Sequence, residues 1–299
     1  MNNNNNDNIP KIIKLKNGDL AYYYFNYSQI QTINFYRDLK IYKYLEENEF
    51  ITDFIQLENN NFIILMFDKI IIYNIENYNF KKNKIIILDN NKLYYKIKSL
   101  SNNNISILSI SKDNRSYLSL LNYPIYKLKE IKLLDIKNAG GELIQIDNLV
   151  IICFALLNYC KVFFLNINDN KLDNINIKSY QTDNSKVKCF KISNDKILLS
   201  TTQTGLIINI KVKQVETFIK HFSNINCIEK IGDLTLVGLN KKFAQINIKK
   251  GKLYNEFITK SNNNIQSRKE LLSIIDVGNN QLCIICDYGG VYLFKYNKY

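Results

Sequence analysis

Residues 55–62 read Ile55-Gln-Leu57-Glu-Asn59-Asn-Asn-Phe62, and the chain repeats the pattern of this stretch along its length. An apolar anchor, Leu57, is followed by a short asparagine-rich turn, and the next apolar residue comes five positions after the anchor. Asparagine, aspartate and glycine tolerate the left-handed backbone that a tight turn between antiparallel strands requires. The stretch therefore predicts a hairpin between two strands.

Seven copies of this turn occur in the sequence. Their anchors lie 39 to 46 residues apart, and in five copies the next apolar residue again falls five positions after the anchor. The copies that begin at Ile146 and Ile231 have shorter turns. A period of about 40–45 residues is typical of repeat architectures. The anchors are Leu15, Leu57, Leu100, Ile146, Ile192, Ile231 and Val277.

Each repeat also contains a third apolar run, and most contain a weaker fourth. In the second repeat these are Ile72–Ile75 and Lys84–Leu88. The runs last 4 to 9 residues and are separated by asparagine clusters. A helical solenoid needs helices of at least about 10–12 residues with a period of 3.6, which the runs do not provide. Each repeat is therefore expected to form about four short strands.

A small four-stranded sheet cannot bury both of its faces alone, but stacked sheets cover each other's faces. The sequence predicts an all-β, seven-bladed β-propeller of about four antiparallel strands per blade, spanning residues 9–299 as one domain. The last repeat, 270–299, has only three strand runs, so we expect either a three-stranded last blade or a double role for Ile9–Lys16 in closing the ring. Residues 1–8 form an asparagine-rich segment that we expect to be disordered.

In its period and its four-strand unit the chain resembles the WD40-repeat family over residues 11–299. The resemblance implies a propeller used as a protein-binding scaffold. The Gly-His and Trp-Asp dipeptides of that family are absent, because the chain has one histidine, His221, and no tryptophan. The hydrogen-bond network that those residues build in the family therefore cannot be assigned to any repeat here.

The composition excludes several classes of protein. The longest apolar run, Leu149–Leu157, is too short for a membrane-spanning helix, which needs about 20 residues. The start of the sequence lacks the basic and apolar regions of a secretory signal, so we expect a cytoplasmic location, with the nucleus as the alternative. The six cysteines lie in apolar segments and are expected to be free and buried. Cys283 and Cys286 have the spacing of a metal or redox site, but no second pair accompanies them.

No enzyme class is indicated by the ionisable residues. The phosphate-binding, zinc-protease and nucleophile motifs are absent from the sequence. His221 is expected in a loop or at a strand edge, Glu46-Glu47 in a loop between blades, and Asp276 and Asp287 at strand ends. We therefore expect no catalytic residues, no cofactor, no metal and no small-molecule substrate.

The net charge of +13 is carried almost entirely by lysine, since only Arg37, Arg115 and Arg268 are arginines. The densest basic cluster brackets one predicted strand, which would place its lysines at opposite ends of that strand. The main hypothesis is a protein-interaction scaffold or adaptor within a larger complex. The alternative is a basic propeller bound to RNA or a ribonucleoprotein particle, although such surfaces usually use arginine. The cluster predicted as a contact surface is Lys241, Lys242, Lys249, Lys250 and Lys252.

Overall fold

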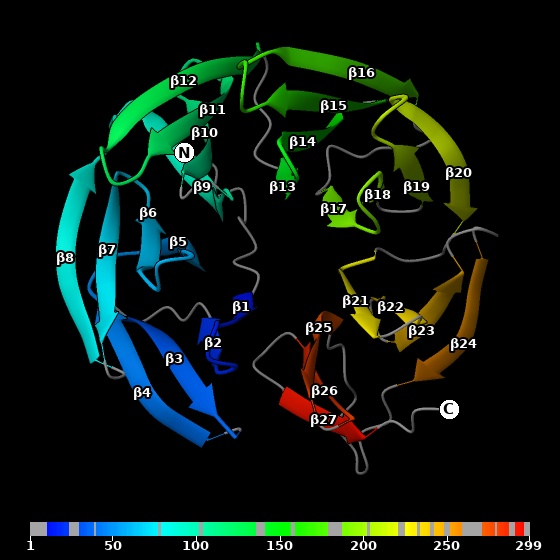
Figure 1. Ribbon diagram of the computed structural model, residues 1–299, viewed down its shortest axis with the longest axis horizontal. Coiled ribbons are helices and arrows are strands. Elements are labelled where there is room, and N and C mark those ends of the chain that lie inside the picture. Colours follow the sequence, from blue (N-terminus) through cyan, green and yellow to red (C-terminus); the bar gives the residue numbers. More distant parts are fainter. Residues whose placement is uncertain are drawn as a thin grey trace. The chain divides into compact units, whose positions relative to one another are not determined.

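A computed structural model describes most of the chain and contains only strands and turns in that part (Figure 1). The fold is a β-propeller of small antiparallel sheets. The asparagine-rich residues 1–8 lie outside the described part. The residues that the structure describes are 11–23, 30–38, 40–76, 79–101, 104–135, 141–156, 159–178, 187–201, 204–220, 225–231, 234–239, 242–247, 252–258, 271–278, 280–286 and 291–295.

The chain divides into two compact units, residues 1–137 and 138–299, and the expected single domain over 9–299 stays a prediction. The first unit contains three four-stranded sheets, which we number blades 1 to 3 in chain order. Within each blade every strand pairs antiparallel with the next one along the chain. The strands are β1 (Lys11–Lys14), β2 (Leu20–Tyr23), β3 (Gln31–Arg37), β4 (Lys40–Glu47), β5 (Ile51–Gln56), β6 (Phe62–Met66), β7 (Lys69–Glu76), β8 (Asn79–Ile87), β9 (Lys92–Ser99), β10 (Ile105–Ser111), β11 (Ser116–Asn122) and β12 (Lys127–Leu134).

The second unit contains blades 4 to 6, each of four strands, and a last sheet of three strands. The strands are β13 (Glu142–Ile146), β14 (Leu149–Leu156), β15 (Tyr159–Asn166), β16 (Leu172–Lys178), β17 (Lys188–Lys191), β18 (Lys196–Ser200), β19 (Thr204–Asn209), β20 (Gln214–Lys220), β21 (Cys227–Ile231), β22 (Leu234–Gly238), β23 (Lys242–Asn247), β24 (Lys252–Ile258), β25 (Leu271–Gly278), β26 (Gln281–Cys286) and β27 (Val291–Lys295).

The expected number of seven blades needs a correction. Six sheets are complete four-stranded blades, and the last sheet, β25–β27, has three strands among the residues described. The physical reason is that the last repeat supplies only three strand-forming runs, while β1 pairs with β2 in blade 1. Of the two expectations for the chain ends, the three-stranded last sheet is therefore the one found.

The predicted hairpin turns are confirmed at the repeated anchors. Leu57 donates its backbone N–H to the carbonyl of Asn61 at 2.8 Å, and Asn60 within this turn has a φ of 67°. The equivalent bond closes the turn after Leu15, where Gly18 has a φ of 87°. These residue types allow the left-handed backbone at low cost. Other turns of the same kind place Asp147 and Asn280 in that region, with φ of 50° and 58°.

Apolar side chains from consecutive blades pack together within each unit. In the first unit, Phe35 of blade 1 and Phe62 of blade 2 lie in one buried cluster, with ring centroids 5.4 Å apart. In the second unit, one cluster joins blades 4 and 5 and another joins blades 5 and 6. The second strand of each blade is nearly fully buried, as in β6 and β14, while the fourth strand is more exposed. Burial therefore decreases from the second strand of each blade to the fourth.

Candidate functional site

The predicted basic cluster falls at the two ends of the β23–β24 ladder. Lys242 is the first residue of β23 and pairs with Ile258, whereas Lys252 is the first residue of β24 and pairs with Asn247. These two backbone positions are at opposite ends of the ladder, in agreement with the sequence argument. The side chains of both lysines lie outside the described residues, so a contact surface here stays a prediction. Lys241, Lys249 and Lys250 lie entirely outside the described residues, so their part in a contact surface also stays a prediction.

The expectation that Glu46 and Glu47 lie in a loop is wrong, because both belong to the end of β4. The Glu47 side chain is buried, accepts a hydrogen bond from the Tyr73 hydroxyl and forms an ion pair with Lys82 at 3.1 Å. Tyr73 and Lys82 belong to blade 2 and are distant from Glu47 in sequence. Their contacts with Glu47 stabilise the end of β4, which continues past its apolar part. The Glu47 carboxylate therefore connects blade 1 to blade 2.

The other ionisable residues considered for catalysis do not form a site in the described residues. Asp276 lies in β25, and its backbone N–H donates to Glu229 Oε1 at 3.0 Å, which joins two consecutive sheets. His221 and Asp287 are outside the described part of the chain.

The most buried charged group of the first unit is Asp53 on β5, whose side chain is 4% exposed. Its Oδ1 accepts the Phe54 N–H at 3.0 Å, and its Oδ2 accepts the Ile97 N–H of β9 at 2.9 Å. Lys11 of β1 completes the arrangement by an ion pair to Asp53 and a hydrogen bond of 2.6 Å to the Phe54 carbonyl. One carboxylate therefore connects blades 1, 2 and 3.

The environment of Lys11 disfavours its charged form. Burial lowers the pKa of Lys11 to about 8; the ion pair with Asp53 opposes this shift, and the nearby charges of Lys96 and Lys98 add to it. A lysine with a lowered pKa is a common feature of catalytic sites. Here, however, the ammonium group already donates to Asp53 and to a backbone carbonyl. We therefore assign Lys11 and Asp53 a structural role between blades.

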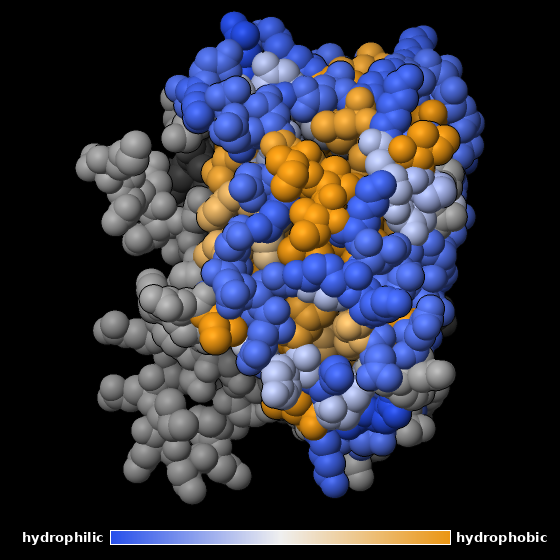
Figure 2. Space-filling view, turned by 90° about the vertical axis from the view of Figure 1, so that its left-hand side faces the viewer, coloured by the Kyte–Doolittle hydropathy of each residue, from blue (hydrophilic) through white to orange (hydrophobic). Residues whose placement is uncertain are grey.

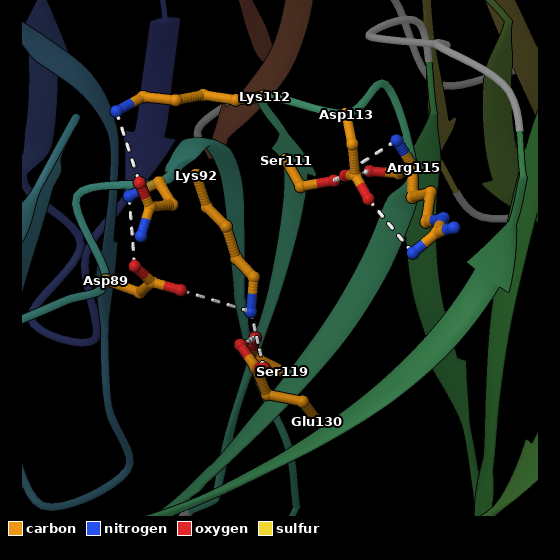
Figure 3. A network of polar contacts seen from close by, with 9 residues as sticks. Asp89, Lys92, Ser111, Lys112, Asp113, Arg115, Ser119 and Glu130 are labelled. Carbon is orange, nitrogen blue, oxygen red and sulfur yellow. Dashed lines mark hydrogen bonds and ion pairs between the residues drawn. The ribbon is translucent and has the colours of Figure 1, made fainter.

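A second polar network covers one end of blade 3 (Figure 3). Lys92 points toward Asp89 and Glu130, with distances of 3.7 Å and 2.5 Å, and it lies over the Tyr117 ring. Nearby, Arg115 pairs with Asp113 at 2.9 Å. The acids and bases of this network neutralise one another, so it provides no uncompensated charge for a ligand and acts as a tie between strands.

The described cysteines confirm the prediction of free, buried thiols. The side chains of five of the six are described, and all five are buried and outside disulfide bonds. Burial raises the pKa of Cys227 to about 12 and that of Cys283 to about 11, which keeps these thiols protonated and unreactive. Within the described part of the chain, no group of three or more metal-ligating side chains could hold a metal ion. No helix in that part is long and apolar enough to cross a membrane.

The feature that best fits a binding surface is the outer strand of blade 2, β8. Figure 1 shows β8 beside β7, and β8 is the terminal strand of its sheet. Its last residues include Ile85 and Ile87, which are 49% and 73% exposed. Before them come three lysines, Lys81, Lys82 and Lys84, all of which are exposed. We call the exposed side chains of Lys81, Lys84, Ile85 and Ile87 the β8 surface.

The turn between β11 and β12 of blade 3 contacts Lys84, whose side chain is on the face of β8 opposite to that of Ile85 and Ile87. Lys84 Nζ lies 3.8 Å from the centre of the Tyr126 ring in this turn. The neighbouring residue, Ile125, is 72% exposed. Figure 2 views the side of Figure 1 on which β8 lies, and it shows hydrophobic residues gathered among hydrophilic ones. Exposed apolar side chains surrounded by polar ones are typical of protein contact surfaces.

The sequence analysis missed the β8 surface. The run Ile85–Ile87 resembles the buried runs elsewhere in the chain, so its composition alone indicates core packing. The signal that could have found it is the lysine-rich start of the same strand, because a strand that begins with Lys81, Lys82 and Lys84 lies at a solvent-exposed sheet edge.

Comparison with known proteins identifies the fold and nothing finer. No protein-family model matches the chain, and no curated protein sequence matches it. Among solved structures, the chain is similar to the N-terminal part of BBS1 in complex with ARL6, with 11% identity over 95% of this chain and 90% of that one and a TM-score of 0.67. It is also similar to the Dos1 propeller, with 12% identity over 93% and 75% of the two chains and a TM-score of 0.68. Saccharomyces cerevisiae Sqt1 matches with 10% identity over 93% and 79% and a TM-score of 0.63. At these identities the likeness shows a β-propeller fold alone.

Proposed function

We propose that this protein is a non-catalytic, WD40-like propeller that acts as a protein-interaction scaffold or adaptor. The observation that carries the proposal is the exposure of Ile85, Ile87 and Ile125, next to exposed lysines, on blades 2 and 3. Exposing such side chains to water costs free energy, about 25 cal/mol per Å² of apolar surface, which a partner protein recovers on binding. The solved structure of BBS1 with ARL6 supports the proposal, since that similar propeller is itself in a complex.

The pairing of buried ionisable groups in the described part of the chain also favours a binding role. Among the described residues, the buried acids and bases pair with one another and with backbone groups that join blades. We propose a cytoplasmic location, with the nucleus as the alternative. We propose no cofactor and no small-molecule substrate.

The proposal is tested by affinity purification of the tagged full chain from its native cells, followed by mass spectrometry. The Ile125→Lys variant is expected to lose one or more specific protein partners, because the lysine places a charge in the contact. Val212→Lys is the matched control, since Val212 is 60% exposed in a turn of the second unit. If Ile125→Lys and Val212→Lys retain the same partners as the wild type, this surface is not used for binding.

The alternative function, association with RNA or a ribonucleoprotein particle, is favoured by the net charge of +13. Phosphate contacts weaken steeply as salt rises, so RNA retention should fall strongly between about 50 and 200 mM salt. A double reversal, Lys81→Glu with Lys84→Glu, should abolish retention if the β8 surface contacts RNA. Retention that is unchanged by both treatments, or absent at low salt, would argue for protein partners instead.

A further inference from the structure

The β8 strand has one unpaired backbone edge in its sheet. The strand order of blade 2 is β5-β6-β7-β8, so β8 pairs with β7 on one side only. Such an edge presents free N–H and C=O groups that can pair with a further strand. Ile85 pairs with Ile71 and Ile87 with Lys69, so the two exposed isoleucines share one face of the sheet.

The sequence of β8 is complementary to itself when two copies run antiparallel. A symmetric pairing centred on Ile86 places Ile85 of each copy opposite Ile87 of the other, on the same face. Directly opposite side chains in an antiparallel pair lie about 4.5–5.5 Å apart and pack together. This centre brings all four exposed isoleucines into one apolar cluster, whereas a centre shifted toward the start of the strand sets isoleucine against lysine.

Lys84 and Asp89 take no part in this complementarity. In β8, Lys84 pairs with Ile72 and Ile86 with Ile70, so Lys84 is on the face opposite to that of Ile85 and Ile87. Lys84 Nζ lies over the Tyr126 ring, and Asp89 already forms an ion pair with Lys92. The two isoleucines and the unpaired edge therefore carry the complementarity between the copies.

We propose that two copies of this chain associate through antiparallel pairing of their β8 strands. The pairing would join two blades 2 into one continuous sheet and cover the isoleucines of both copies. A closed two-fold contact uses the same surface on both partners, which the pairing of Ile85 with Ile87 satisfies. The inference rests on the proposed use of the β8 surface for protein contact, and it names a second copy of the chain as the occupant.

The first experiment is sedimentation equilibrium of the purified full chain at about 0.15 M salt, where charges more than about 8 Å apart are largely screened. The average mass should rise with concentration from 35.1 kDa toward twice that value. Ile87→Lys should weaken association by at least about tenfold, because it buries two unpaired charges in the apolar cluster. Val212→Lys should leave it unchanged.

The second experiment repeats the measurement with Ile85→Lys. This variant should weaken association as Ile87→Lys does, because Ile85 of each copy lies opposite Ile87 of the other. Circular dichroism of each variant reports whether it is folded.

A wild-type mass of 35.1 kDa at every concentration would overturn the inference and indicate that the lysines of β8 protect the edge from pairing. A dimer that Ile87→Lys or Ile85→Lys leaves intact would overturn it as well. If the chain is monomeric but Ile125→Lys still loses partners, this inference fails and the proposed function stands. If the dimer forms but no partner depends on Ile125, the proposed function fails.

Discussion

Replacing Asp53 with alanine is expected to destabilise the first unit by about 3 kcal/mol. The change removes the acceptor of the buried Ile97 N–H, and an unsatisfied buried donor costs about 1–3 kcal/mol. It also leaves the Lys11 ammonium without its counter-charge, and breaking a buried ion pair costs about 3–5 kcal/mol in total. We take the lower part of that range because the Lys11 side chain is 26% exposed.

Removing both partners should cost less than the two single changes predict. Lys11→Met removes a charge whose burial is already unfavourable, as its lowered pKa of about 8 indicates. In the double variant, the alanine at position 53 no longer leaves an unpaired ammonium behind. We therefore expect an interaction free energy of about 2 kcal/mol between the two positions, above the roughly 0.5 kcal/mol seen for independent sites. Asp53→Asn keeps an acceptor for Ile97 and should lie between wild type and alanine.

The assay is urea unfolding followed by far-UV circular dichroism for the wild type, both single variants and the double variant. If the free energy of unfolding falls by about 3 kcal/mol per M of urea, the midpoint of unfolding of the alanine variant should lie about 1 M lower than that of the wild type. A loss below about 1 kcal/mol, or single effects that simply add, would refute the idea that this carboxylate ties three blades together.

The burial of Lys11 also predicts a pH dependence. The pKa of Lys11 is about 8 in the folded protein and 10.5 unperturbed, so between these values the unfolded chain binds more protons. Stability then rises with pH through this window. The wild type should gain stability relative to Lys11→Met between pH 8 and 10, and an unchanged difference would contradict the burial argument.

Three further predictions concern the core and the turns. Burial raises the pKa of Tyr94 from 10.0 to about 12, so its contribution to stability should be lost between pH 10 and 12; urea unfolding should show the wild type losing stability relative to Tyr94→Phe over this range, and an unchanged difference would contradict the burial argument. Gly18→Ala should destabilise by about 1 kcal/mol in urea unfolding because φ is 87° with open space around it, so only backbone strain acts; a neutral effect would refute this. Leu57→Ala should cost about 2–5 kcal/mol by leaving a cavity at a fully buried anchor, and a thermal melt within about 2 °C of wild type would contradict that packing.

Much of the fold could be predicted because its unit is local. The turns after Leu15 and Leu57 depend on a few neighbouring residues with left-handed backbone, so their pattern is legible in the sequence. The repeat then implied small sheets that need neighbours of the same kind. The blade count was less secure, because a repeat with three strand runs forms a partial sheet that the spacing of anchors alone counts as a blade.

The candidate site was not predicted, because exposure depends on what packs against a strand. Ile85 and Ile87 have the same composition as the buried isoleucines of β7, and only their place on the last strand of the sheet leaves them in water. In the opposite sense, Asp53 and Glu47 are charged residues that contacts with neighbouring blades bury.

The sequence by itself determined the strand-rich repeat, its turns and the lack of catalytic motifs, since these follow from residues close together in the chain. The tertiary structure alone decided which side chains are buried. Asp53 is satisfied by partners 42 and 44 residues away, and the isoleucines of β8 are exposed because no further strand covers them. Burial is a property of contacts between distant residues, so it becomes known only when the blades are assembled.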